Sequence, residues 1–91
     1  MKRRLLDILA CPMCKHHPID LLVFEEGQEI EAGILTCGSC GRWYPIIDGI
    51  PHMLPDELRE CEEDVGFLSK WKGRVPEAIL REGKPYSLKN L

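Results

Sequence analysis

The sequence lacks the arrangements of side chains by which most enzymes are identified. It contains no Gly-rich turn that could cradle phosphates between a strand and a helix. It shows no Ser/His/Asp or Cys/His nucleophile arrangement and no spaced pair of carboxylates in a recognisable context. These absences predict a chain that is not an enzyme on its own.

Long apolar runs and a basic surface are also missing. Nothing in the 91 residues approaches the ~18 consecutive apolar residues of a membrane span. A short apolar run follows the basic residues 2–4, but Asp7 interrupts it, and the run is shorter than an export signal requires. The formal net charge is −3 and the pI is 5.6, whereas domains that grip phosphates usually have a pI above ~9. The sequence therefore predicts no membrane segment and no primary nucleic-acid binding.

Four of the five cysteines form two Cys-x-x-Cys pairs. Cys11 and Cys14 make the first pair and Cys37 and Cys40 make the second. Two thiolates on one tight turn point to the same side, so two such turns can together form the tetrahedral tetrathiolate site that zinc prefers. This spacing predicts one structural zinc ion per chain. A disulfide pair or a thioredoxin-like redox motif is the alternative.

A bound metal would have a large effect on a chain this short. A domain of this size buries only roughly 60% to 65% of its unfolded surface. Zinc binding to small domains is worth ~10–16 kcal/mol near neutral pH, which matches or exceeds the net stability of most domains. We therefore expect the metal to fold the protein. Because metal-binding cysteines need a reducing compartment and no export signal is evident, we also expect a cytoplasmic location.

Alternating apolar residues and turn signals predict an antiparallel sheet. Residues 19–24 and 28–36 can pair as a hairpin, and residues 42–47 are aromatic and β-branched, hence extended. Asp48-Gly49 is a strong two-residue turn signal. The two prolines in residues 50–55 exclude a central strand there, and we expect an edge strand over 50–54.

Helices are predicted at both ends of the chain. The leucines of residues 5–9 share one face of a short N-terminal helix. Asp56 can cap a helix that runs through Trp71, and a second helix is predicted over 77–82, after a proline and before a glycine. Residues 84–91 are expected to form a loose tail.

The predicted fold class is α+β: a small zinc-ribbon-like antiparallel sheet with a short N-terminal helix and a helical C-terminal tail. Residues 1–55 would form the zinc-binding ribbon domain. Residues 56–91 would form a helical C-terminal extension that is packed on the ribbon or trails from it.

Three blocks of sequence resemble a known family more specifically than the cysteines do: LLDILACPMC at 5–14, CGSCG at 37–41 and WYPI-x-DGIP-x-ML at 43–54. They are similar to the small zinc-ribbon activator subunit shared by tRNA, rRNA and release-factor methyltransferases, in its archaeal form. The resemblance implies a non-catalytic activating and stabilising subunit of S-adenosylmethionine-dependent methyltransferases. It further implies a heterodimer with one or several methyltransferases, in which a strand of the activator extends the sheet of the enzyme.

The residues themselves also suggest an interaction surface. The stretch 43–55 holds more large apolar side chains than one face of a small ribbon can bury, and concentrated apolar surface usually marks a binding site. A core role for some of these residues is the alternative. The predicted contacts with the enzyme are Leu5, Trp43, Ile46, Ile47, Ile50, Pro51, Met53 and Leu54.

Two other functions fit parts of the sequence. A rubredoxin-like electron carrier also uses two Cys-x-x-Cys pairs in a small acidic protein, but an aromatic content of 7% and a long helical tail fit it less well. A zinc ribbon that binds nucleic acid directly is disfavoured by the acidic charge. Cys61 lies in an acidic run outside the pairs, and we expect it to be a bystander thiol.

Overall fold

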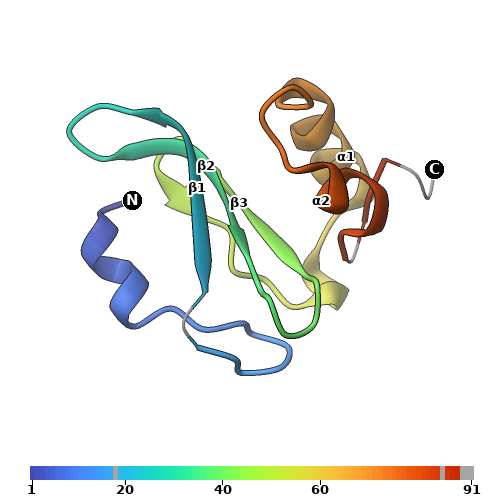
Figure 1. The fold of residues 1–91 in the computed structure, drawn as a ribbon, viewed down its shortest axis with the longest axis horizontal. Coiled ribbons are helices and arrows are strands. Elements are labelled where there is room, and N and C mark those ends of the chain that lie inside the picture. Colours follow the sequence, from blue (N-terminus) through green and yellow to red (C-terminus); the bar gives the residue numbers. More distant parts are fainter. Residues whose placement is uncertain (18, 85, 89–91) are drawn as a thin grey trace.

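A four-stranded antiparallel sheet is the centre of the molecule, shown by a computed structural model that describes residues 1–17, 19–84 and 86–88 (Figure 1). The strands pair in the order in which they occur along the chain. This confirms the predicted antiparallel sheet of an α+β fold. The strands are β1 (Asp20–Glu26), β2 (Ile30–Thr36), β3 (Trp43–Ile47) and β4 (Ile50–Pro51).

Two glycines of the sheet lie where a side chain would not fit or where the backbone conformation is left-handed. A Cβ at Gly33 would lie 2.7 Å from the carbonyl oxygen of Leu22, and the register of β1 shifts just beyond this pairing. Asp48 and Gly49 have φ values of 52° and 78°, as a two-residue turn of the I′ type requires. The predicted turn between β3 and β4 is confirmed.

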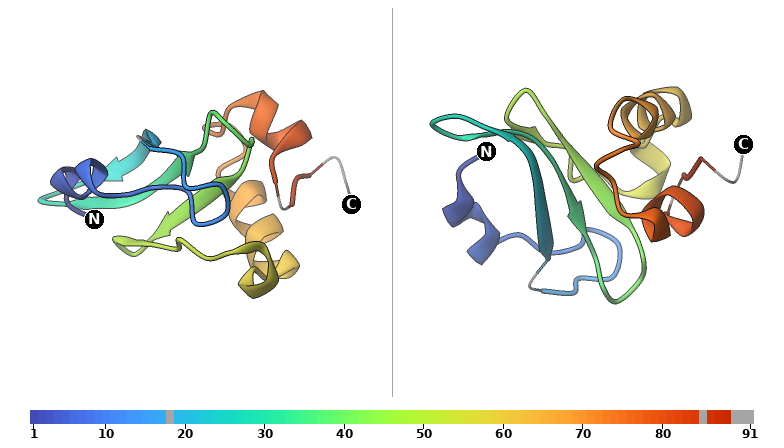
Figure 2. Two further views of the ribbon diagram at one scale, coloured as in Figure 1. Left: turned by 90° about the horizontal axis from the view of Figure 1, so that it is seen from below. Right: turned by 45° about the horizontal axis from the view of Figure 1, so that its top comes forward.

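The sheet lies between two layers, which Figures 1 and 2 show from three directions. On one side is the N-terminal segment with the 3₁₀ helix η1 (Arg3–Asp7); on the other are α1 (Cys61–Lys70) and α2 (Glu77–Glu82). The α2 bounds match the predicted second helix. No helix among the described residues has the length and hydropathy needed to cross a bilayer.

Each face of the sheet has its own core. The first cluster packs against the partly buried leucines of residues 5–9, and its buried members are Met1, Cys11, Ile19, Ile30, Leu35, Cys37, Tyr44 and Ile46. The second cluster joins the sheet to the helices, and its buried members are Phe24, Ala32, Ile34, Trp43, Phe67, Leu68 and Val75. A strand covered on both faces is apolar along its whole length, which explains the near-continuous apolar run of β3.

This double burial corrects part of the predicted interaction surface. Trp43 and Ile46 each have a relative exposure of 0%. Trp43 packs beneath the helices, and Ile46 points into the opposite cluster. Both are therefore core residues, and the C-terminal helices account for part of the apolar excess that the sequence shows in 43–55.

The single helix predicted from Asp56 to Trp71 is wrong. The chain instead forms a 3₁₀ turn, η2 (Asp56–Leu58), becomes extended at Arg59, and begins α1 at Cys61. Arg42 donates two hydrogen bonds, of 2.9 and 2.8 Å, to the carboxylate of Asp56, so this aspartate does not cap a helix. Arg59 turns inward, donates to the carbonyl of Trp43 at 2.7 Å and forms a buried ion pair of 2.8 Å with Asp64.

The described part of the segment after α2 is docked rather than loose. The backbone N–H of Lys84 donates to the carbonyl of Gly41 at 3.2 Å, and the carbonyl of Lys84 accepts from the N–H of Trp43 at 3.1 Å. The indole Nε1 of Trp43 donates to the carbonyl of Tyr86 at 2.9 Å. The prediction of a loose tail is wrong for these residues; its positions 85 and 89–91 lie outside the described residues.

Candidate metal centre

The four paired cysteines meet at one point, although the chain between the pairs forms a whole hairpin. Their Sγ atoms all lie within 4.8 Å of one another. The Sγ atoms of Cys14 and Cys37 are 3.5 Å apart, and those of Cys11 and Cys40 are 3.6 Å apart. A tetrahedral ion with metal–sulfur bonds of ~2.3 Å would separate its sulfurs by about 3.8 Å. All four thiols are free, which is contrary to the alternative of a disulfide, and the donor set fits a metal ion.

The two Cys-x-x-Cys turns have the same backbone geometry. In each turn, the residue after the second cysteine donates its N–H to the carbonyl of the first cysteine, at 2.8 Å from Lys15 and 3.0 Å from Gly41. Both residues are left-handed, with φ values of 66° and 77°. The first cysteine of each turn donates its own N–H to the carbonyl of the residue five positions later, at 3.0 Å from Cys11 to His16 and 2.8 Å from Cys37 to Arg42. Two loops of different sequence thus present their thiols in matching ways.

The surroundings of the thiols supply hydrogen-bond donors. Burial alone would raise the pKa of Cys11, but the Tyr44 hydroxyl, 3.1 Å from its Sγ, and nearby backbone amides lower that pKa to about 6. Burial likewise opposes ionisation of Cys40, but the side chain and backbone N–H of Arg42, together with the Cys37 thiol, outweigh it and lower the pKa of Cys40. Burial raises the pKa of Cys37 to about 12. A bound divalent cation deprotonates coordinating thiols outright, so these donors would then stabilise the charge of the cluster.

The Tyr44 hydroxyl gives a first testable prediction. Replacing Tyr44 with phenylalanine should weaken metal binding roughly 10- to 100-fold, the usual effect of losing a hydrogen-bonding partner of a metal ligand. A competition titration against a chromophoric chelator measures this affinity. Tyr86→Phe is the matched control, because Tyr86 binds the Trp43 indole through its backbone carbonyl, which the substitution leaves in place. Equal affinities of the two variants would contradict the role of the Tyr44 hydroxyl.

The remaining predicted contact residues lie on or next to β4 in the chain, except Leu5, which lies on η1 and packs against the first cluster. β4 pairs with β3 on one side only among the described residues, and it covers two residues rather than the predicted 50–54. Ile50 is 61% exposed and Leu54 is 37% exposed. The other four predicted contacts outside the core are half-buried: Leu5, Ile47, Pro51 and Met53.

Comparison with known proteins places this chain, with its sheet and four-cysteine cluster, in a family. Residues 2–49 match the model of the Trm112p-like protein family. The chain belongs to this family. A UPF0434 protein of Coxiella burnetii is 49% identical over 63 residues, which cover 69% of this chain and 98% of the relative. A UPF0434 protein of Hahella chejuensis is 45% identical over 64 residues, which cover 70% of this chain and 93% of the relative.

A solved structure extends the likeness to the fold. The Trm112 methyltransferase activator of Haloferax volcanii, solved in a complex with a protein described as a methyltransferase, is 43% identical to this Trm112p-like chain, with a TM-score of 0.58. The match covers 64% of this chain and 100% of that one. About a third of the present chain thus lies outside the likeness to these shorter proteins.

Proposed function

We propose that the chain is a non-catalytic activating and stabilising subunit of S-adenosylmethionine-dependent methyltransferases that act on tRNA, rRNA or a translation release factor. The observation that carries this proposal is the match to a methyltransferase activator that was solved together with its partner. The match covers the whole of that activator and 64% of the present chain. The chain works as a heterodimer with one or several such enzymes in the cytoplasm. It contributes binding energy and no catalytic group.

The metal of this subunit is a single structural zinc ion held by Cys11, Cys14, Cys37 and Cys40. The free thiols and their separations support zinc, because this ion prefers four soft ligands in a tetrahedron. When bound, the ion supplies a cross-link between the two loops and has no open coordination position. Its contribution to activation is therefore indirect, through the stability of the sheet.

The enzyme binds at the β4 edge of the sheet. An edge strand offers unpaired backbone groups, and strand addition uses main-chain hydrogen bonds that place few demands on the sequence of the partner. That property suits a subunit shared among different enzymes. Apolar contacts next to the edge would come from Ile47, Ile50, Pro51, Met53 and Leu54, with Leu5 from the N-terminal helix.

Residues 1–55 and 56–91 have different roles in this proposal. The family match ends at residue 49, which supports a shared zinc-binding ribbon domain in 1–55. We assign 56–91 to a helical extension, and the helices of its described part cover the second face of the sheet.

Affinity purification of the tagged chain from its native cell, followed by mass spectrometry, tests the proposal. We expect a methyltransferase in near-stoichiometric amount, because a dedicated activator should be bound to its enzyme at cellular concentrations. A second purification at high salt serves as a control, because an interface of mainly apolar contacts should survive it. Recovery of only electron-transfer proteins, or of nucleic acid without an enzyme, would contradict an activator role.

A further inference from the structure

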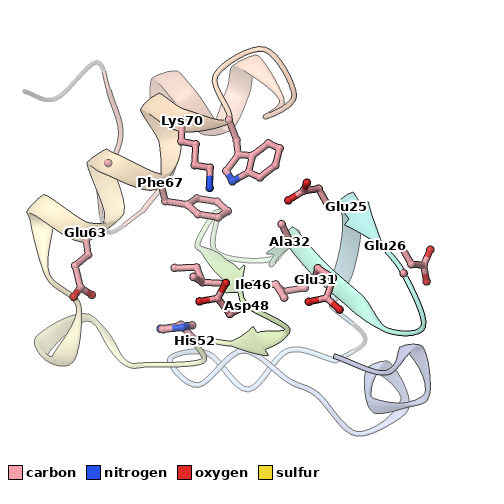
Figure 3. Close-up of a pocket in the computed structure, with 14 residues that line it drawn as sticks. Glu25, Glu26, Glu31, Ala32, Ile46, Asp48, His52, Glu63, Phe67 and Lys70 are labelled. Atoms are coloured by element: carbon pink, nitrogen blue, oxygen red, sulfur yellow. The ribbon is translucent and has the colours of Figure 1, made fainter.

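A groove of about 790 Å³ opens between the sheet and α1 (Figure 3). Apolar side chains from β2, β3 and the end of α1 line it, among them Ala32, Ile47, Phe67 and Trp71. The Trp71 ring is held in place by Phe24, whose ring centroid is 5.0 Å away. None of the four metal-binding cysteines lines the groove, so it is a site separate from the metal centre.

Carboxylates surround this apolar floor. They come from the β1–β2 hairpin, the β3–β4 turn and α1: Glu25, Glu26, Glu31, Asp48 and Glu63. In Figure 3 the Glu26 carboxylate points away from the groove. Among the described residues, Lys70 is the only lysine or arginine of the lining. It lies over the Trp71 ring, with its Nζ atom 5.3 Å from the ring centroid. The rim is therefore strongly acidic.

Most of this negative charge has no partner within the described chain. Glu26 pairs with Arg3 at 2.7 Å. No salt bridge among the described residues involves any of the other four carboxylates of the rim. A concave site lined by one sign of charge focuses its field and attracts groups of opposite charge. An apolar floor beneath such a rim favours a ligand with cationic groups beside an apolar body.

We propose that this groove docks a polypeptide segment of another protein in which lysine or arginine residues flank a large apolar side chain. The cations meet the acidic rim, and the apolar side chain covers Trp71 and Ile47. Nucleic acid does not suit the site, because the carboxylates repel phosphates. A polyamine would satisfy the rim and leave the apolar floor uncovered. The proposal goes beyond the activator role; of the residues assigned to the β4 edge, the groove includes Ile47.

The two tryptophans of the chain allow a direct test. Trp71 is half-buried in the groove, whereas Trp43 is fully buried, with its indole Nε1 bonded to the carbonyl of Tyr86. In NMR titrations of the metal-loaded full chain, a short peptide alternating lysine and leucine should shift the Trp71 indole resonance saturably. The Trp43 indole should stay nearly unchanged. A glutamate–leucine peptide, a lysine–serine peptide and spermidine should each bind at least roughly tenfold more weakly. The first lacks the cations, and the other two lack the large apolar side chain.

A matched pair of triple variants locates the binding. Glu25→Gln, Glu31→Gln and Asp48→Asn together remove three charges of the rim, and asparagine tolerates the left-handed backbone at position 48. This variant should bind the lysine–leucine peptide roughly tenfold more weakly. The control removes three exposed carboxylates that do not line the groove, in the variant Glu57→Gln, Glu62→Gln and Glu82→Gln, and should change binding less than about twofold.

Several results would overturn the proposal. One is the absence of a saturable shift at Trp71 with the lysine–leucine peptide on the wild-type chain. Equal binding of spermidine or of the lysine–serine peptide would show that charge alone is recognised. Equal weakening in the two triple variants would show a general charge effect rather than a groove. A Trp71 shift that depends on protein concentration without peptide would indicate a second copy of this chain as the occupant.

Discussion

Replacing Cys37 with serine is expected to abolish metal binding and unfold much of the sheet. Cys37 is 2% exposed and begins the second Cys-x-x-Cys turn. A serine hydroxyl is a poor ligand for zinc and would leave three thiols without their fourth partner. Zinc binding to small domains is worth ~10–16 kcal/mol, and the net stability of a domain is only ~5–15 kcal/mol. The loss should therefore exceed what the two apolar cores can offset.

Elemental analysis and circular dichroism measure this effect. We expect one zinc per wild-type chain and none in Cys37→Ser, with loss of the strand signal. Chelation of the wild-type chain should produce the same change. Cys61→Ser is the matched control, because Cys61 is exposed and lies outside the cluster. A red iron-containing protein, or a Cys37→Ser chain with unchanged metal content and unfolding midpoint, would contradict the structural zinc site.

Replacing Ile50 with aspartate is the second change with a large expected effect. Ile50 is 61% exposed at the edge strand, so the substitution should hardly disturb the isolated chain. In the complex it would place a charge in an apolar contact, which should cost at least about 3 kcal/mol, or roughly a hundredfold in affinity. We therefore expect Ile50→Asp to abolish co-purification with the methyltransferase while metal content stays normal.

The opposite edge of the sheet provides the control for this experiment. Leu22 lies on β1 and is 40% exposed, so Leu22→Asp makes the same kind of change away from the proposed interface. It should leave co-purification intact. Met53 is a less suitable target, because its side chain packs partly against the core. Full binding by Ile50→Asp, or equal loss in both variants, would show that the β4 edge is not the interface.

Local signals in the sequence were sufficient to predict the sheet and the cysteine cluster. The Asp48-Gly49 turn depends on backbone preferences of two residues, and the α2 bounds depend on one proline and one glycine. The Cys-x-x-Cys pairs predicted one cluster because few other uses fit four such thiols in a short chain. The structure brings these cysteines together as expected.

Contacts between distant segments could not be predicted in the same way. Aspartate is a residue type that often caps helices, but the carboxylate of Asp56 accepts two hydrogen bonds from Arg42, 14 residues earlier in the chain. Tyr44 belongs to an apolar block, and only the pairing of β3 places its hydroxyl beside Cys11. Trp43 was expected at an interface and instead lies beneath α1, because the second face of the sheet is covered by residues far along the chain.

The rate of methyl transfer by the partner enzyme tests the central claim most directly. The enzyme recovered with the chain should be measured with labelled S-adenosylmethionine in three forms: alone, with the wild-type chain, and with the Ile50→Asp chain. An activator that only binds and stabilises predicts high activity with the wild-type chain. It predicts little soluble, active enzyme in the other two cases, and no activity of the chain by itself. An enzyme that is equally soluble and active without the chain would contradict the account.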